Sequence, residues 1–322
     1  MKYIDKIILA LVIFGFVSCS KTEIESVLTH DFLKKTEAPP VVGEKLEFAY
    51  AMATKSSKLT SVTAIVTFPG STGTGFETKS YRTNASGTEI GTVVADTSTV
   101  SATSTATFKV DTNASTLRYT YVVPPAAKGK NISVTFKVQS ADGKSVSLTT
   151  PEYRVSSVDI AKNVVMTNNN ACYFSLETMK SYTEAQVIAQ NLAAKIDLVY
   201  IFSATSGGFI YGHALVSPGT ESTYLNGKII PASFAKNVSK LEKKAFINDM
   251  LLSGIVPATY VDDIDFQTLN LSQAASFVLD LKTTARNSVF VESADGKYRA
   301  YLYINNSTTS NLTFSLKRFT VL

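Results

Sequence analysis

Alternation of apolar and polar residues dominates the chain between Val41 and Val155 and constrains its fold more than any other feature. Runs rich in β-branched and aromatic residues recur there, for example over residues 45–50, 62–68 and 117–123. Clusters of Gly, Pro, Asn and Asp separate these runs, and no helical stretch interrupts them. Short alternating strands divided by turns are typical of an antiparallel β-sandwich. We therefore predict an all-β domain over residues 41–157.

Two further features refine this prediction. Residues 134–139 and 144–148 flank Asp142-Gly143, which supplies the positive φ that a tight hairpin turn requires. Residues 71–75 are too rich in Gly and Thr for a strand, so we predict a loop there. The chain has no Trp and only 2 Cys, so the Cys…Trp…Cys pattern of true immunoglobulin domains is missing. The sandwich is expected to be Ig-like in architecture only.

The periodicity changes after a predicted hinge at residues 156–159. Strands are expected over residues 173–177, 195–202 and 312–321. Helices are expected over residues 183–193, where Thr183 would be the N-cap, and 239–252, where Ser239 and Glu242 match a capping box. A third helix is predicted over 271–281, and Asp295-Gly296 predicts a second hairpin turn. This mixture predicts an α+β domain over residues 164–322.

The N-terminus carries a secretory signal. Lys2 and Lys6 precede the apolar run 7–14. That run is shorter than the roughly 20 residues that span a bilayer. Val17-Ser18-Cys19 resembles the lipobox of bacterial lipoproteins, which implies removal of residues 1–18 and acylation of Cys19. Acyl chains on Cys19 would anchor the protein to a membrane, with residues 19–40 as a tether that ends at Pro39-Pro40.

Charge and cysteine content exclude other classes. The net charge of +5 is small and scattered, and the lysines at 236, 240, 243 and 244 are expected to form a solvated helix face. Because the chain is also exported, we predict no nucleic-acid partner. With Cys19 lipidated, Cys172 has no intramolecular partner, so the fold does not depend on a disulfide. Cys172 is predicted to be a small buried residue at the start of a strand.

Catalytic motifs are missing from the sequence. It contains no His-Glu-x-x-His, Cys-x-x-Cys, Gly-x-Ser-x-Gly or phosphate-binding Gly-x-x-x-x-Gly-Lys motif. Only His213 lies outside the tether, and we interpret it as a hydrogen-bonded structural residue. We therefore predict that the protein is not an enzyme, has no catalytic residue and uses no cofactor.

Three acids, Asp262, Asp263 and Asp265, lie within four residues. Hard cations such as Ca²⁺ bind oxygen ligands of this kind, but the spacing does not match an EF-hand loop. We predict a solvated acidic loop and no metal site. Cation binding at these three residues, or hydrolysis by carboxylates of this domain, remains the alternative.

Tyrosines provide the candidates for ligand contact. The chain has 15 Tyr, and Tyr211, Tyr224 and Tyr260 lie near Gly, Pro or Asp, as loop residues do. Tyr supplies rigid contact area with a polar tip, and loops commonly carry recognition. We predict that these three tyrosines bind ligand. Packing in the core is the alternative.

The chain as a whole resembles the surface lipoproteins that accompany Sus-type outer-membrane nutrient-uptake systems. The resemblance rests on the lipobox, the tether with Glu23 and Glu25, the sandwich after Pro39-Pro40 and the second domain. It implies a protein anchored to the outer membrane and facing the cell exterior, beside a TonB-dependent transporter and its lid lipoprotein.

We accordingly expect a non-catalytic accessory protein that binds a ligand or scaffolds such a complex. The lack of Trp favours an oligopeptide over a glycan as the ligand. A surface hydrolase and a lipid- or sterol-binding lipoprotein are the alternatives.

Overall fold

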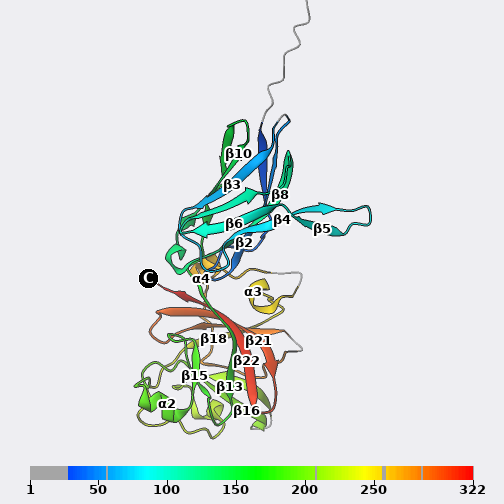
Figure 1. Cartoon of the computed structure of the whole chain (residues 1–322). Helices are drawn as coiled ribbons and strands as arrows, with labels where there is room; N and C mark the ends of the chain where they lie inside the picture. Colours follow the sequence, from blue (N-terminus) through cyan, green and yellow to red (C-terminus); the bar gives the residue numbers. More distant parts are fainter. Residues whose placement is uncertain (1–27, 56, 207–208, 256–258, 284–285, 322) are drawn as a thin grey trace, which may run out of the picture.

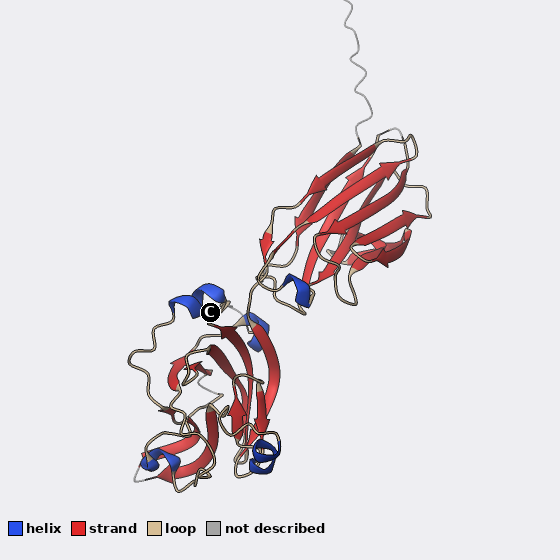
Figure 2. Ribbon diagram, turned by 90° about the vertical axis from the view of Figure 1, so that its left-hand side faces the viewer, coloured by secondary structure: helices blue, strands red, loops and turns tan. Residues whose placement is uncertain are grey.

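The computed structural model describes residues 28–55, 57–206, 209–255, 259–283 and 286–321. Two β-rich domains lie end to end and are joined by one connection near residue 156 (Figure 1). Figure 2 shows the same two bodies from the side, with the short helices α3 (Met250–Ser253) and α4 (Asp263–Thr268) at the junction. Within the described ranges, no helix is both long and apolar enough to cross a bilayer.

The first domain is a sandwich of two antiparallel five-stranded sheets. One sheet has the order β1 (Thr29–Lys34), β2 (Lys45–Ala53), β8 (Ala114–Val122), β4 (Gly75–Thr83), β5 (Glu89–Val93). The other has the order β11 (Ser145–Thr149), β10 (Val134–Ser140), β3 (Leu59–Val66), β7 (Thr103–Phe108), β6 (Ala95–Val100). A short pair, β9 (Asn131–Ile132) and β12 (Tyr153–Arg154), and a 3-10 helix, η1 (Pro125–Ala127), complete it.

Aromatic side chains fill the space between these two sheets. The ring of Phe136, on β10, stacks on Tyr50 with centroids 4.6 Å apart and meets Phe48 and Tyr119 edge-on at 5.7 Å. All four are completely buried, and each such side chain contributes roughly 1.5–3 kcal/mol of hydrophobic stabilisation. The predicted all-β sandwich is confirmed, as is the hairpin turn at Asp142-Gly143, where Gly143 has φ +80°.

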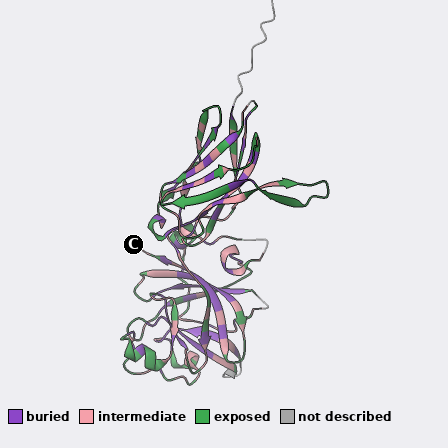
Figure 3. Cartoon of the chain, in the orientation of Figure 1, coloured by how far each residue is buried: buried purple, intermediate pink, exposed green. Residues whose placement is uncertain are grey.

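The predicted tether is too long. Residues 29–34, which were assigned to it, form the edge strand β1 and pair with β2 from Thr29↔Ala53 to Lys34↔Phe48. The reason is apolar packing, because Phe32 lies against Phe48 and Phe136, and Leu28 is buried. At the opposite edge, the β4–β5 hairpin projects from the sandwich, and every residue of β5 is exposed (Figures 1 and 3).

The second domain also contains two antiparallel sheets. One has the order β13 (Asp159–Thr167), β22 (Asn311–Thr320), β21 (Tyr298–Ser307), β20 (Asn287–Glu292), β18 (Lys240–Ala245). The other has the order β15 (Lys180–Tyr182), β14 (Tyr173–Ser175), β16 (Leu198–Ser206), β17 (Phe209–Val216), β19 (Phe277–Val278). Its helical elements are α2 (Glu184–Ala189), η2 (Ser222–Leu225), α3 and α4. The fold class is confirmed as a β-sandwich followed by sheets combined with short helices. The second domain begins at β13, five residues before the predicted 164.

Of the three predicted helices, the one that begins at Thr183 is confirmed and the other two are largely wrong. Thr183 caps α2 through a capping box with Gln186, as its sequence indicated. The helix predicted over 239–252 is wrong in its first half, where β18 pairs with β20 from Lys240↔Glu292 to Ala245↔Asn287. Good helix formers are overridden here because the free edge of β20 offers a full set of backbone hydrogen bonds. Only the last turn is helical: it is α3, and Gly254 at φ +65° ends it.

The helix predicted over 271–281 is also wrong. Its central residues form β19, whose Val278 pairs with Leu215 of β17. Leu271, Val278 and Leu281 are all buried, as the apolar spacing suggested, but they do not lie on one face of a helix. The C-terminal strand prediction is confirmed, since β22 lies between β13 and β21.

Candidate functional site

The three tyrosines predicted to contact ligand occupy very different places. Tyr211 is not a surface residue: it lies in β17, is fully buried, and its hydroxyl donates to the Tyr224 carbonyl at 2.6 Å. Tyr224, in η2, is half-buried and stacks on Phe277 with ring centroids 3.6 Å apart. Both rings serve packing. Tyr260 lines a cleft.

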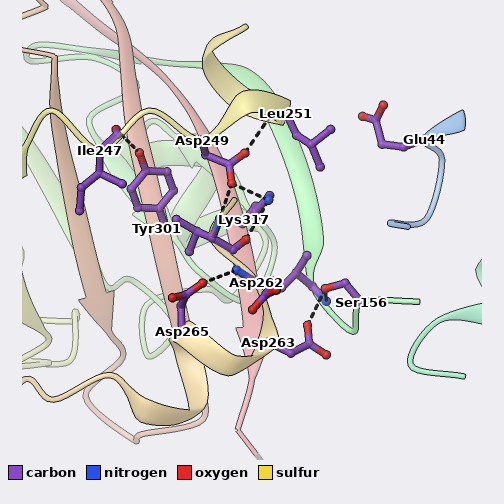
Figure 4. A network of polar contacts seen from close by, with 12 residues as sticks. Glu44, Ser156, Ile247, Asp249, Leu251, Asp262, Asp263, Asp265, Tyr301 and Lys317 are labelled. Atoms are coloured by element: carbon purple, nitrogen blue, oxygen red, sulfur yellow. Dashed lines mark hydrogen bonds and ion pairs between the residues drawn. The ribbon is translucent and has the colours of Figure 1, made fainter. Parts of the chain in front are cut away.

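That cleft lies between the two domains and has a volume of about 640 Å³. The first domain contributes the segment 35–39 after β1 and the segment 43–47 at the start of β2. The second domain contributes Lys162 from β13 and Met250, Leu251 and Tyr260 from the segment around α3. In Figure 4, Leu251 of the second domain and Glu44 of the first domain lie on opposite sides of the cleft. Ligand sites occur preferentially at such domain interfaces.

The cleft lining carries charges of both signs. The residues concerned are Lys35, Lys45, Lys162, Glu37, Glu44 and Glu47. One ion pair links the domains at the cleft wall, where Lys162 Nζ lies 2.8 Å from Glu44 Oε1. Both side chains are substantially exposed, so this pair contributes at most about 1 kcal/mol. The Lys162–Glu44 pair therefore contributes little to the stability of the fold.

A buried ion pair anchors the second-domain wall. Asp249 accepts from Lys317 Nζ at 2.6 Å and from the backbone N–H groups of Leu251 and Val261 at 3.0 and 2.7 Å. Lys317 also donates to the Val261 carbonyl at 2.8 Å. Asp249 and Val261 are the two ends of the segment that carries Met250, Leu251 and Tyr260. The network in Figure 4 therefore closes this segment at its base and presents its side chains to the cleft.

The three acids predicted to form a solvated loop instead begin a helix. Asp262 is the N-cap of α4 and accepts from the Ile264 N–H at 3.0 Å, while Asp265 accepts from the Asp262 N–H at 2.8 Å. A capping box satisfies backbone donors that would otherwise lack partners. The loop prediction was wrong because the residue three positions after the N-cap is Asp265, whereas a capping box usually has Glu or Gln at this position.

Asp263 has a different task. Its carboxylate accepts from the Ser156 hydroxyl at 2.5 Å, from the Ser157 hydroxyl at 2.5 Å and from the Ser157 N–H at 3.0 Å (Figure 4). It thereby ties the interdomain connection to the second domain. The three side chains point to separate partners, and no group of three His, Cys, Asp or Glu side chains in the described part of the chain is arranged to hold a metal ion.

An apolar cluster completes the junction. Val41 from the first domain and Val158 from the connection are buried with residues of the second domain: Leu252, Val261, Phe266, Leu271, Phe290, Tyr301, Tyr303 and Phe319. Phe266 of α4 stacks on Phe319 with centroids 5.8 Å apart. The cleft therefore lies beside a packed contact between the domains.

His213 and Cys172 have structural places. His213, in β17, shares a hydrogen bond of 2.8 Å between its Nδ1 and the Tyr200 hydroxyl, and burial lowers its imidazole pKa. Cys172 is fully buried immediately before β14, and burial raises the pKa of its thiol. Both predictions are confirmed. Cys19 lies outside the described residues.

Sequence reasoning missed Asp249 and Lys317. The alternation gave no signal, because Lys317 shares the polar face of the predicted strand with Thr313 and Ser315. In the fold Ser315 and Lys317 are buried as well, and a buried lysine requires a counter-charge. The partner itself is 68 residues away in sequence, so the pairing could not be identified without the fold.

The fold and cleft define a two-domain β protein with its best candidate site at the domain junction. Residues 25–155 match the family model DUF4466, a domain of unknown function, and residues 156–321 match DUF8576, also a domain of unknown function. A crystal structure of a DUF4466 family protein from Parabacteroides merdae ATCC 43184 is 37% identical, with a TM-score of 0.84, and the match covers 92% of this chain and 99% of that one. The chain belongs to the DUF4466 family.

Other solved structures are similar only in part. A family 123 glycoside hydrolase from Clostridium perfringens matches 40% of this chain and 27% of its own at 15% identity and a TM-score of 0.25. The major pilin subunit BcpA of Bacillus cereus matches 91% of this chain and 66% of its own at 10% identity and a TM-score of 0.28. Neither likeness is close enough to inform function. The comparison with curated proteins gives no match.

Proposed function

We propose that this protein is a non-catalytic, lipid-anchored accessory protein of the outer membrane that binds an oligopeptide in the cleft between its two domains. It would work on the cell exterior beside a TonB-dependent transporter and its lid lipoprotein. A glycan is the second candidate ligand. The membrane location rests on the lipobox resemblance at Cys19, and the binding role rests on the cleft.

The observation that carries the binding role is the composition of the cleft. Met250, Leu251 and Tyr260 offer apolar and aromatic contact, while lysines and glutamates of the opposite wall can pair with charged side chains and termini. Extended peptides present the same combination of apolar and charged groups. The volume of about 640 Å³ accommodates a few residues of such a chain.

Rigidity of the frame supports the same role. The second-domain wall is closed by Asp249 and Lys317, and the connection is held by Asp263. A site on a preorganised frame loses less conformational entropy on binding. The hydrolase alternative would use carboxylates of the second domain, and two of these, Asp262 and Asp263, are engaged by N–H or hydroxyl groups of the chain itself. We therefore favour binding over catalysis.

Calorimetry with defined peptide pools tests the binding role. Tyr260→Ala is expected to weaken peptide binding about tenfold or more, because a central aromatic contact is lost. Ile188→Ala is the control, since Ile188 is 58% exposed on α2, at the far end of the second domain (Figure 1). Equal affinity of the Tyr260→Ala and Ile188→Ala proteins would exclude the cleft as the peptide site.

The membrane role needs its own test. Metabolic labelling with a fatty-acid probe is expected to mark the wild type, and Cys19→Ser is expected to remain unlabelled and to leave the membrane fraction. Affinity purification from detergent-solubilised outer membranes should recover a TonB-dependent transporter. Recovery of the labelled lipoprotein without any transporter component would reject the accessory role while leaving the anchor and the peptide site intact.

A further inference from the structure

A second cavity lies around Asp197 in the second domain and shares no lining residue with the cleft at Tyr260. Its volume is about 190 Å³. Asp197 immediately precedes β16 and is 7% exposed. The other lining residues come from the turn after β14, the segment before Asp197, the loop before β18 and the β20–β21 turn: Glu177, Ala194, Lys195, Asn237, Ala294, Asp295, Lys297 and Tyr298.

Asp197 is the buried carboxylate that lacks a counter-charge. Within the described residues, three carboxylates are buried, and the other two have cationic partners: Asp249 pairs with Lys317, and Glu292 pairs with Lys240 and Arg299. No basic side chain of the described residues forms an ion pair with Asp197. Its Oδ2 accepts from the Leu176 N–H at 2.7 Å, and no described donor bonds to Oδ1.

The lysines that line the cavity are already engaged by other acids. Lys195 Nζ lies 2.6 Å from Glu177, and Lys297 Nζ lies 3.1 Å from Asp295. Three carboxylates therefore face two ammonium groups, and the cavity has an excess of one negative charge when Asp197 is ionised. A buried carboxylate in this position must take up either a proton or a cation.

The protonation behaviour agrees with this geometry. The pKa of the Asp197 carboxyl is raised to about 7, chiefly by burial and to a smaller extent by the negative charges of Asp295 and Glu177, while the hydrogen bond from the Leu176 N–H opposes the shift. Near neutral pH the group is thus poised between a protonated and an ionised form. A bound cation would favour the ionised form.

We propose that this cavity binds the primary ammonium group of a small ligand, with Asp197 as its counter-ion. An ammonium needs only a few oxygen acceptors, whereas the carboxylates here are not arranged as a metal site. The excess of negative charge disfavours anions. The volume accommodates an aminoalkyl group, such as a peptide N-terminus, or part of an amino sugar. This site is independent of the cleft at Tyr260.

Calorimetry at pH 7, where the amino groups are mostly protonated, tests the proposal with glucosamine and alaninamide, and with N-acetylglucosamine and N-acetylalaninamide as neutral counterparts. At least one amine is expected to bind, and its N-acetyl counterpart is expected to bind at least tenfold more weakly. The amine that binds identifies the source of the ammonium. If neither amine binds at millimolar concentration, or if each binds no better than its N-acetyl form, the proposal is wrong.

The variant Asp197→Asn provides the residue-level test. Asparagine keeps an acceptor for the Leu176 N–H but carries no charge, so amine affinity should fall at least tenfold. Asp111→Asn, an exposed carboxylate of the first domain, should leave affinity unchanged. Unaltered amine binding by Asp197→Asn would overturn the assignment.

A measurement on the wild type does not depend on the folding of any variant. Amine affinity should fall roughly tenfold for each pH unit below 7, because binding then requires removal of a proton from Asp197. Affinity that is constant between pH 5 and 8 would also overturn the assignment.

Discussion

The carboxylate of Asp249 and the ammonium of Lys317 form an ion pair of 2.6 Å inside the second domain, where the two side chains are 0% and 1% exposed. The pair closes the segment that bears Leu251 and Tyr260, so it links the stability of the domain to the shape of the cleft. Such a pair is costly to break, because the remaining charge stays buried without compensation.

Lys317→Met is therefore expected to destabilise the protein by about 3–5 kcal/mol, as measured by urea denaturation. Adding Asp249→Asn should recover part of the loss, because the uncompensated charge is removed. Lys162→Met is the control: it breaks the exposed pair with Glu44 and should cost less than about 1 kcal/mol. Equal losses for the two lysine variants would contradict this interpretation.

Asp263 should control how firmly the domains are joined. Asp263→Asn removes the negative charge that accepts hydrogen bonds from Ser156 and Ser157. A hydrogen bond to a charged group contributes about 1.5–3 kcal/mol, so the variant should hold the interdomain connection less firmly. Small-angle X-ray scattering should then show a wider distribution of interdomain distances. Asp265→Asn alters the cap of the same helix without touching the connection, and its scattering should match the wild type. Identical scattering from Asp263→Asn would show that the apolar cluster alone sets the geometry.

Asp197 makes stability depend on pH in a direction opposite to that of most carboxylates. Its pKa in the fold, about 7, lies above its value in the unfolded chain, so the folded state binds the additional proton. This contribution to stability is present below pH 4 and is lost as the pH rises through 7. Asp197→Asn should match the wild type near pH 4 and exceed it by roughly 1–4 kcal/mol at pH 8, at about 1.4 kcal/mol for each pKa unit.

Asp295, which lines the same cavity as Asp197, should show the opposite dependence of stability on pH. Although burial acts to raise it, the pKa of Asp295 is lowered by hydrogen bonds from Ser293 and Lys297. The stabilisation that Asp295 contributes is therefore present above the pKa of the unfolded chain and is lost as the pH falls through the lower pKa of the folded state. Asp295→Asn should be less stable than the wild type at pH 7 and equal to it at low pH, as followed by thermal melting. The same pH trend for both variants would contradict the two assignments.

Cys172 should be chemically inert in the folded protein. It is fully buried, and burial raises the pKa of its thiol, so both access and thiolate formation are suppressed. In a Cys19→Ser background, a thiol reagent such as DTNB should react only after urea is added. A stoichiometric reaction within minutes under native conditions would show that the segment at the start of β14 opens readily.

Local signals were sufficient for much of the fold. The alternation around Phe48 and Phe136 identified the strands of the sandwich, and Asp-Gly pairs identified two hairpin turns. The cap at Thr183 located α2 because a capping box involves residues only three apart. Each of these features depends on neighbours in the sequence, so each can be identified from the sequence.

The candidate site was accessible to sequence reasoning only in part. Tyr260 was predicted to contact ligand and lines the cleft, but the same reasoning chose Tyr211, which is a core residue of β17. A tyrosine beside a glycine has no local feature that separates a loop from a strand. Lys240–Ala245 is a similar case, because helix propensity is a preference of one segment, whereas strand pairing depends on a distant partner such as β20.

The sequence by itself determined the alternating strands, the turns and the buried thiol, since these follow from spacing and residue type. Tertiary structure alone decided which charges meet. It brought Lys317 to Asp249 and Asp263 to Ser156, and it left Asp197 at a cavity whose two lysines pair with other acids. The physical reason is that electrostatic pairing depends on distance and burial in three dimensions, and neither is encoded in separation along the chain.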